Sequence, residues 1–305
     1  MGISANAKGF VEKQAVCRRI TQSMTMIQPF QKDDSLLAEI RSTATDANTF
    51  ACWWLGQSGF LIKWAGKHLL LDPYLSDSLT KKYAATNKPH VRMTELVIDP
   101  ARLDFIDVVT SSHNHTDHLD AETLIPLMQA NPKLKMLIPE ANRAFVAERI
   151  KCDPSWPIGV DAGQSRDIRD FKFWAVPAAH EAIDRDEAGQ CRYLGYVVQF
   201  GKFSIYHSGD TVLFDGMADL LRPLEVDVAF LPINGADPKR CVAGNLDCRE
   251  AAELGKAIGA QYVVPCHYDM FEFNTAEVRE FEQEAKMKKQ PYRVMQAGEG
   301  VRFQS

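Results

Sequence analysis

The sequence predicts an α/β (α+β) fold in which two β-sheets pack face to face and helices cover their outer sides. Two observations predict it. Strand-like and helix-like segments are mixed along two successive halves of the chain, which is typical of a layered α/β protein. In addition, residues 106–109 (IDVV) in the first half echo residues 226–229 (VDVA) in the second, and both lead into loops rich in polar residues.

The first half starts with an N-terminal extension, residues 1–48, in which residues 34–41 (DSLLAEIR) predict a short helix. Glycine-containing turns then separate three strand-like runs at 51–55, 59–64 and 68–71, which indicates an antiparallel start. Residues 74–104 are polar and irregular, and a loop of this length is more often functional than a mere connection. Next come a buried strand at 105–112, a helix from its N-cap Asp120 to about Ala130, a strand at 134–138 and a helix at 142–150.

The second half predicts further strands and two helices. The strands are expected at 168–178, 193–200, 203–207, 226–233, 261–266 and 292–296. One helix is expected at 246–258, with Asn245 as N-cap and Gly259 as its stop, and another at 276–289.

Composition excludes some classes of function. The chain has 305 residues, of which 46% are hydrophobic, and its formal net charge is −5. It therefore lacks the excess positive charge with which proteins bind nucleic acid non-specifically. A small anionic substrate is still possible, because it needs only a few local cations. No run of about 18 apolar residues predicts a membrane span, and the first 30 residues show no signal peptide. Seven scattered cysteines without a CxxC pair fit reduced thiols, so a cytoplasmic location is expected.

The residues most informative about function are His113, His115, Asp117 and His118, which fall within six positions directly after a predicted buried strand. Imidazole and carboxylate ligands delivered into a tight loop can hold divalent metal. His113 and His115 are two apart and can point the same way from an extended segment. Asp117 and His118 follow where the chain turns, and can aim at a second, adjacent ion.

Three further candidate ligands follow other predicted strands, namely His180, Asp210 and His267. Ligands gathered at strand ends from across a chain are how a rigid sheet preorganises a site. A lone histidine in such a place more often has a structural role. Because three candidates follow the first motif along the chain, metal binding is here the favoured interpretation. His207 is expected to be a buried supporting histidine, and His90 a loop residue.

The pattern HxHxDH at 113–118, then His180, Asp210 within SGDT and His267 resembles the metallo-β-lactamase superfamily from about Phe50 to the C-terminus. Within it the chain is similar to the L-ascorbate-6-phosphate lactonase group, through WWLG at 53–56, Arg92-x-Thr94 with Asp99-Pro100, YHSGD at 206–210 and Pro265-x-His267. The resemblance implies a four-layer αββα sandwich, with a hydrolase domain at 49–305 after the extension.

The resemblance also implies a dinuclear metal site between the sheets. By the family pattern, His113, His115 and His180 hold one ion, Asp117, His118 and His267 hold the other, and Asp210 bridges them. Two such ions can share a hydroxide that attacks a carbonyl or phosphorus, with Asp117 best placed to orient it or relay a proton. The His/Asp ligand set suits zinc, manganese or, less well, iron; the lactonases favour manganese and the superfamily at large zinc.

Substrate contacts are harder to predict. Arg92 matches an arginine of the lactonase pattern and is expected to meet a phosphate or carboxylate. Lys239 and Arg240 follow a predicted strand and could reach the same cleft, the alternative for all three being solvated loop cations.

These features favour a metal-dependent hydrolase of a small, anionic molecule: an ester or lactone, with a phosphorylated sugar lactone as one form. The alternative is a phosphodiesterase acting on a small-molecule, lipid or nucleic-acid phosphodiester. A nuclease ranks low because the chain is acidic and no large insert separates Asp210 from His267. A di-iron redox enzyme and a regulatory protein without activity are further alternatives, and a homo-oligomer is left open.

Overall fold

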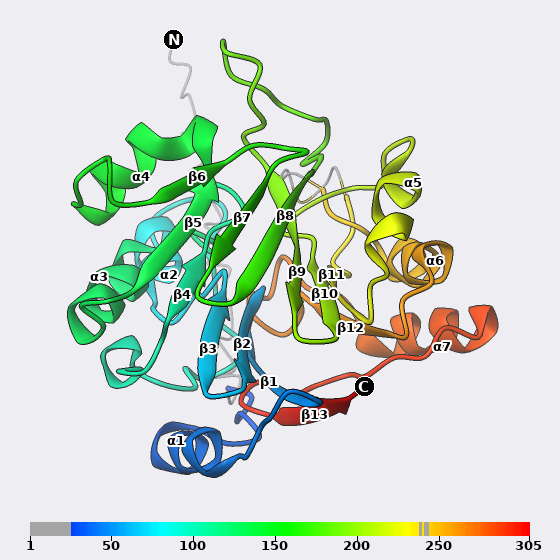
Figure 1. Ribbon diagram of the computed structural model, residues 1–305, viewed down its shortest axis with the longest axis horizontal. Helices are drawn as coiled ribbons and strands as arrows, with labels where there is room; N and C mark the ends of the chain where they lie inside the picture. The colour runs from blue at the N-terminus through cyan, green and yellow to red at the C-terminus, as the bar shows by residue number, and fades with distance from the viewer. Residues whose placement is uncertain (1–25, 238–239, 241–243) are drawn as a thin grey trace, which may run out of the picture.

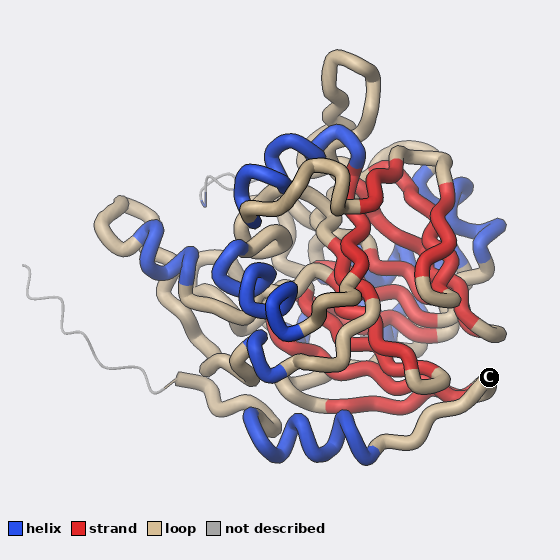
Figure 2. Tube along the Cα trace, turned by 60° about the vertical axis from the view of Figure 1, so that its left-hand side comes forward, coloured by secondary structure: helices blue, strands red, loops and turns tan. Residues whose placement is uncertain are grey.

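A computed structural model of the protein describes residues 26–237, 240 and 244–305. Two β-sheets lie face to face in the middle of the molecule, and helices flank them on both outer sides (Figures 1 and 2). The chain therefore has the α/β sandwich that the sequence predicted.

The first sheet contains β1 (Thr49–Gly56), β2 (Gly59–Trp64), β3 (Lys67–Leu71), β4 (Val108–Thr110), β5 (Lys135–Pro139), β6 (Ile158–Val160) and β13 (Gly300–Gln304). The second contains β7 (Ser165–Ile168), β8 (Phe171–Pro177), β9 (Leu194–Phe200), β10 (Phe203–His207), β11 (Val228–Pro232) and β12 (Tyr262–Cys266). The strand orders are β13-β1-β2-β3-β4-β5-β6 and β12-β11-β10-β9-β8-β7.

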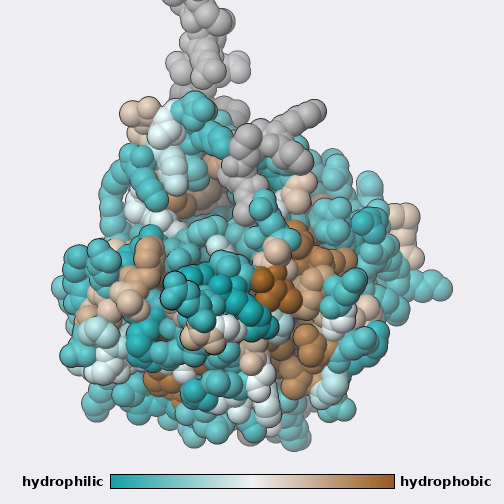
Figure 3. Space-filling view, turned by 90° about the horizontal axis from the view of Figure 1, so that it is seen from above, coloured by the Kyte–Doolittle hydropathy of each residue, from teal (hydrophilic) through white to brown (hydrophobic). Residues whose placement is uncertain are grey.

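The helices are α1 (Asp33–Ser42), α2 (Ser78–Tyr83), α3 (Ala121–Ala130), α4 (Arg143–Ile150), α5 (Met217–Leu221), α6 (Cys248–Ile258) and α7 (Val278–Lys288). In Figure 1, α3 and α4 lie beside the first sheet, whereas α5, α6 and α7 lie beside the second. Among the described residues, no helix is both long enough and apolar enough to span a bilayer. The face seen in Figure 3 is mostly hydrophilic, with hydrophobic side chains gathered in a few patches.

The two sheets are built on one plan, which explains the sequence echo. In each, an antiparallel three-stranded unit (β1-β2-β3 or β8-β9-β10) is extended by parallel strands. The echoing segments lead into β4, which pairs in parallel with β3, and into β11, which pairs in parallel with β10. Each is the first parallel strand of its sheet, so the two loops that follow start from corresponding places.

Aromatic side chains join the two sheets. The ring of Phe50 in β1 lies 5.4 Å from that of Phe200 in β9 and 4.8 Å from that of Phe203 in β10, both edge to face. Phe60 in β2 lies 4.3 Å from Phe230 in β11. All are buried, and burying one such side chain stabilises a fold by about 1.5–3 kcal/mol. These aromatic contacts therefore fix the two sheets relative to each other.

The described part of the N-terminal extension packs on the sandwich. Leu36, Leu37 and Ile40 of α1 are buried in the main hydrophobic core. The ammonium group of Lys63 in β2 donates to the carbonyl oxygens of Ile40 (2.7 Å) and Arg41 (3.2 Å), at the end of α1 where carbonyls lack helical partners. The predicted boundary at residue 48 thus does not separate α1 from the core.

The N-cap that the sequence predicted for α6 is corrected. Asp247, not Asn245, is the N-cap of α6, because its side chain accepts from the backbone N–H of Glu250 (2.7 Å) while the Glu250 carboxylate accepts from that of Asp247 (3.0 Å). Such a reciprocal capping box satisfies two otherwise unpaired donors. Gly259 ends the helix as predicted, in the left-handed conformation.

The last strand also differs from the prediction. Residues 292–296 form only an isolated bridge from Tyr292 to Val263, and the final strand is instead β13, paired with β1. The predicted segment passes from the edge of the second sheet to the edge of the first, so it cannot keep pairing with either. In the first half, the polar stretch 74–104 contains the unpredicted helix α2, and the strand expected at 105–112 is limited to β4.

Candidate metal centre

The structure brings all seven predicted ligands together where four strands end. His113, His115, Asp117 and His118 lie in the loop between β4 and α3. His180 follows β8, Asp210 follows β10 and His267 follows β12. The first loop therefore comes from one sheet and the other three residues from the second, so the site lies at the junction of the two sheets.

The side chains fall into two groups. His113, His115 and His180 form one; Asp117, His118, Asp210 and His267 form the other. Within each group, one potential ligand atom of every residue lies within 4.8 Å of the others. Asp210 faces the imidazoles of its group, with Oδ1 3.2 Å from His118 Nε2 and Oδ2 3.5 Å from His267 Nε2. This grouping is compatible with two adjacent ions.

Three of the imidazoles are held through Nδ1, which leaves Nε2 of each ring available to bind a metal ion. Nδ1 of His118 lies 2.8 Å from the Asp72 carboxylate, and Nδ1 of His180 lies 3.0 Å from the carbonyl oxygen of Gly244. Nδ1 of His113 lies 3.0 Å from the Ser112 hydroxyl. Nε2 of His113 is buried and has no hydrogen-bond partner among the described residues, and Nε2 of His118 is buried and faces Asp210 Oδ1. Nitrogens placed in this way, with the ring oriented by a contact to Nδ1, fit metal ligation.

The carboxylates and imidazoles of the site shift one another's pKa values. Burial raises the pKa of Asp210, but the imidazoles of His118 and His267 outweigh it and hold that pKa well below its ordinary value. Conversely, burial lowers the pKa of His267, but Asp210 and Asp117 outweigh it and raise the pKa to about 9. Burial lowers the pKa of His113 well below 6.5, so this imidazole is neutral and has a free lone pair. Divalent cations would satisfy both carboxylates.

Sequence reasoning missed Asp72, which supports the centre from beneath. It is fully buried after β3 and accepts hydrogen bonds from the Thr110 hydroxyl (2.8 Å) and the Ser112 N–H (3.0 Å) as well as contacting His118. A carboxylate behind a ligating histidine fixes the orientation and tautomer of the ring. The available sequence signal was an aspartate that ends a buried strand directly before a proline.

Gln57 was also missed, because the sequence identifies it only as a turn residue between two strands. Its φ of 50° is left-handed, and its carbonyl accepts from Trp54 Nε1 (3.0 Å) and the His267 N–H (3.1 Å). This backbone places its amide nitrogen 2.8 Å from Asp117 Oδ2 and 3.0 Å from His267 Nε2. Gln57 therefore helps to position two candidate ligands.

A cavity of about 300 Å³ opens beside the ligands. Described residues that line it include His115, Asp117, His180, Asp210 and His267 together with Gln57, Asn245, Asn274, Lys88 and a group of aromatic side chains. His90, expected to be only a loop residue, is one of these aromatics. His207 is buried with Nε2 2.8 Å from the Ser58 carbonyl and belongs to neither ligand group, in keeping with a supporting role.

The predicted substrate-binding cations do not meet at this cavity. Arg92 is not among its lining residues, and its guanidinium, only 6% exposed, donates to Asp77 Oδ1 (2.6 Å), the Ser76 carbonyl and the Thr94 carbonyl (3.3 Å). Arg240 donates to the Asn274 side chain (3.1 Å) and to backbone carbonyls, so it reaches the cavity only through Asn274. Lys239 lies outside the described residues.

This placement favours a structural role for Arg92. We expect Arg92→Ala to lower the free energy of unfolding by about 1–3 kcal/mol, because its loss leaves the Ser76 and Thr94 carbonyls without the nearly buried guanidinium that donates to them. Chemical denaturation would measure the loss, with Arg41→Ala, whose exposed ion pair should contribute under about 1 kcal/mol, as the control. An unchanged stability with a selectively raised KM for anionic substrates would instead restore the anion-binding role.

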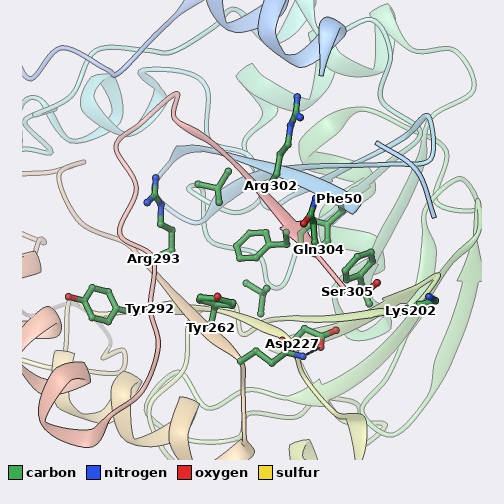
Figure 4. Close-up of a pocket in the computed structure, with 14 residues that line it drawn as sticks. Phe50, Lys202, Asp227, Tyr262, Tyr292, Arg293, Arg302, Gln304 and Ser305 are labelled. Carbon is green, nitrogen blue, oxygen red and sulfur yellow. Dashed lines mark hydrogen bonds between the residues drawn. The ribbon is translucent and has the colours of Figure 1, made fainter. Parts of the chain in front are cut away.

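A larger cavity, about 660 Å³, lies away from the ligands. Its lining includes Tyr262 at the start of β12 and Arg302, Gln304 and Ser305 in and after β13 (Figure 4). None of the seven candidate ligands lines it. Of these two cavities, the smaller one therefore adjoins the candidate metal ligands.

Comparison with known proteins agrees with this geometry. Residues 67–268 match the model of the beta-lactamase superfamily domain. A metal-dependent hydrolase from Caldivirga maquilingensis is 30% identical over 72% of this chain and 82% of its own length. A probable L-ascorbate-6-phosphate lactonase from Escherichia coli is 25% identical over 89% of this chain and 84% of its own. A metallo hydrolase structure from Ignicoccus hospitalis is 24% identical, with a TM-score of 0.62, covering 84% of this chain and 99% of its own.

Proposed function

This chain belongs to the beta-lactamase superfamily and is a metal-dependent hydrolase, and from that premise we propose that it hydrolyses a small-molecule ester or lactone. The observation that carries the proposal is the pair of ligand groups at the side of a small cavity. A volume of about 300 Å³ is at the lower end of ligand pockets and suits a small molecule. The similarity to a probable lactonase supports attack at a carbonyl carbon.

We assign the ligands as the family resemblance implies them. His113, His115 and His180 would hold one ion, Asp117, His118 and His267 would hold a second, and Asp210 would contribute to both. Zinc and manganese both suit these nitrogen and oxygen donors. When bound, such ions lower the pKa of a coordinated water and polarise a carbonyl oxygen. The catalytic domain is assigned to residues 49–305, with residues 1–48 as an extension attached to it.

The chain's own residues then position the reactants. Asp117 lines the cavity, and the histidines beside it keep its pKa low despite burial, so it is a carboxylate that can accept a hydrogen bond from the attacking water and orient it. The Gln57 amide holds Asp117 Oδ2 in place. Asp72, through His118, fixes the opposite side of the centre.

A panel of lactones, carboxylic esters and phosphodiesters, assayed with protein reconstituted in turn with manganese and zinc, tests the proposal. We expect turnover of lactones or esters, and none after chelation. In ¹⁸O-labelled water the label should enter the product carboxylate. Label found only in a phosphate product would overturn attack at carbon in favour of the alternative, a phosphodiesterase. Elemental analysis should find close to two transition-metal ions per chain.

A further inference from the structure

A small hydrophobic cluster, separate from the main core, lies beside the metal centre. Its buried members and those packed against them are Tyr74, Leu79, Met270, Phe271, Tyr83 and Phe273. They come from α2 with its flanks and from the segment after His267, which are far apart in sequence. Four of them, Leu79, Tyr83, Phe271 and Phe273, also line the cavity. One side of the cavity is therefore apolar.

His90 completes this side, and Tyr83, His90, Phe271 and Phe273 together are called the aromatic wall. The His90 ring stacks on Tyr83 at 4.3 Å between centroids and meets Phe273 edge to face at 4.6 Å. Its Nδ1 lies 3.1 Å from the Lys88 carbonyl, which can only accept, so Nδ1 carries the hydrogen. Burial lowers the pKa of His90, which keeps the ring uncharged at neutral pH.

The wall is held in place by the backbone. The N–H of Met93 donates to the Met270 carbonyl (2.9 Å), and the N–H of Glu272 donates to the Val91 carbonyl (3.1 Å). Arg92, between these two bonds, donates to the sulfur of Met270 (3.0 Å) and ties the cluster to the segment after α2. A surface preorganised in this way loses little entropy when a ligand packs on it.

The rest of the cavity offers amide groups rather than a cluster of cations. Oε1 of Gln57 and Oδ1 of Asn245 are buried and have no hydrogen-bond partner among the described residues. Lys88 is the one lysine or arginine among the described lining residues. Phosphate recognition commonly relies on arginine forks or on several convergent cations, which this lining does not provide. The part of the lining that the structure describes is thus better matched to a flat apolar group than to a phosphorylated one.

On the premise of the proposed function, we propose that the substrate is an ester or lactone whose acyl part carries a flat apolar group, an aryl or unsaturated ring. The ring packs against the aromatic wall while the carbonyl reaches the metal centre. The reaction remains hydrolysis: water supplies OH to the carbonyl carbon, the carbon–oxygen bond breaks, and the leaving oxygen takes the other proton. Contacts between aromatic rings stabilise a complex by more than the burial of their apolar area alone provides.

Product-like acids test this without relying on turnover. Calorimetry with the full, manganese-loaded protein should show phenylacetate binding at least tenfold more tightly than acetate. Phe273→Ala should remove most of that difference and leave acetate binding unchanged. If Phe273→Ala lowers the melting temperature too far for binding measurements, Phe273→Leu replaces it, because leucine keeps an apolar side chain but has no ring. Tyr262→Ala, at the larger cavity, should change neither affinity.

Equal binding of the two acids would overturn the inference, and so would a Phe273 variant that weakens both alike. Tighter binding of 6-phosphogluconate than of phenylacetate would also overturn it, in favour of a phosphorylated substrate. Failure of the proposed function would look different. In that case phenylacetate would keep its preference for the wild-type protein, but no ester or lactone, aryl or aliphatic, would be hydrolysed.

Discussion

Asp210→Asn is expected to lower kcat/KM by about 10³-fold or more and to reduce the bound metal from close to two ions per chain to one or fewer. Asp210 is buried, and its two oxygens face His118 and His267 from a single carboxylate. Asparagine keeps the shape but replaces one oxygen by an NH₂ group that cannot ligate, and it removes a negative charge. A loss of about 4 kcal/mol of transition-state stabilisation corresponds to this rate effect.

Elemental analysis and steady-state kinetics on the same preparations would measure both effects. Asp215→Asn is the matched control, because Asp215 lies on the same loop after β10 but is exposed. It should keep full metal content and activity. An Asp210→Asn protein with two ions and unimpaired turnover would contradict the bridging assignment, whereas a loss of activity with full metal content would restrict Asp210 to orienting the reactants.

The convergence of the seven candidate ligands could be predicted because each follows a strand. A buried strand is visible in sequence as a short apolar run, and polar residues directly after it must lie at the edge of a sheet. The similarity of residues 106–109 and 226–229 indicated two halves, and β4 and β11 indeed occupy corresponding places. The side-chain chemistry of His and Asp then indicated what gathers at that edge.

The supporting residues could not be predicted in the same way. Gly56 indicates a turn here, but not that Gln57 itself takes a left-handed conformation, and Asp72 acts through contacts with residues about 40 positions further along the chain. The aromatic wall exists only because residues 91–93 pair with the segment after His267. Arg92 was placed by family resemblance, but local packing satisfies it internally. Such partners depend on tertiary pairing rather than on periodicity.

Asp72→Ala is expected to lower metal affinity by about 10–100-fold and the free energy of unfolding of the metal-free protein by about 3–5 kcal/mol. The substitution leaves the Thr110 hydroxyl, the Ser112 N–H and Nδ1 of His118 without their shared acceptor in a fully buried place. Each unsatisfied buried group costs about 1–3 kcal/mol, and a histidine without its carboxylate is free to turn.

Asp72→Asn separates the two effects, because an amide oxygen can still accept from Ser112 while the negative charge behind His118 is gone. It should retain more stability than Asp72→Ala but show a similar loss of metal affinity. Denaturation of the metal-free protein and competition with a chelator would measure the two quantities.

Asp107→Ala is the control, because Asp107 accepts a hydrogen bond from the backbone N–H of His68 (2.9 Å) outside the metal centre. It should cost about 1 kcal/mol and leave metal affinity unchanged. If Asp72→Asn bound metal as tightly as the wild type, Asp72 would be a purely structural hydrogen-bond acceptor, and the orientation of His118 would have to be fixed by the Ser112 hydroxyl, 3.3 Å from Nδ1.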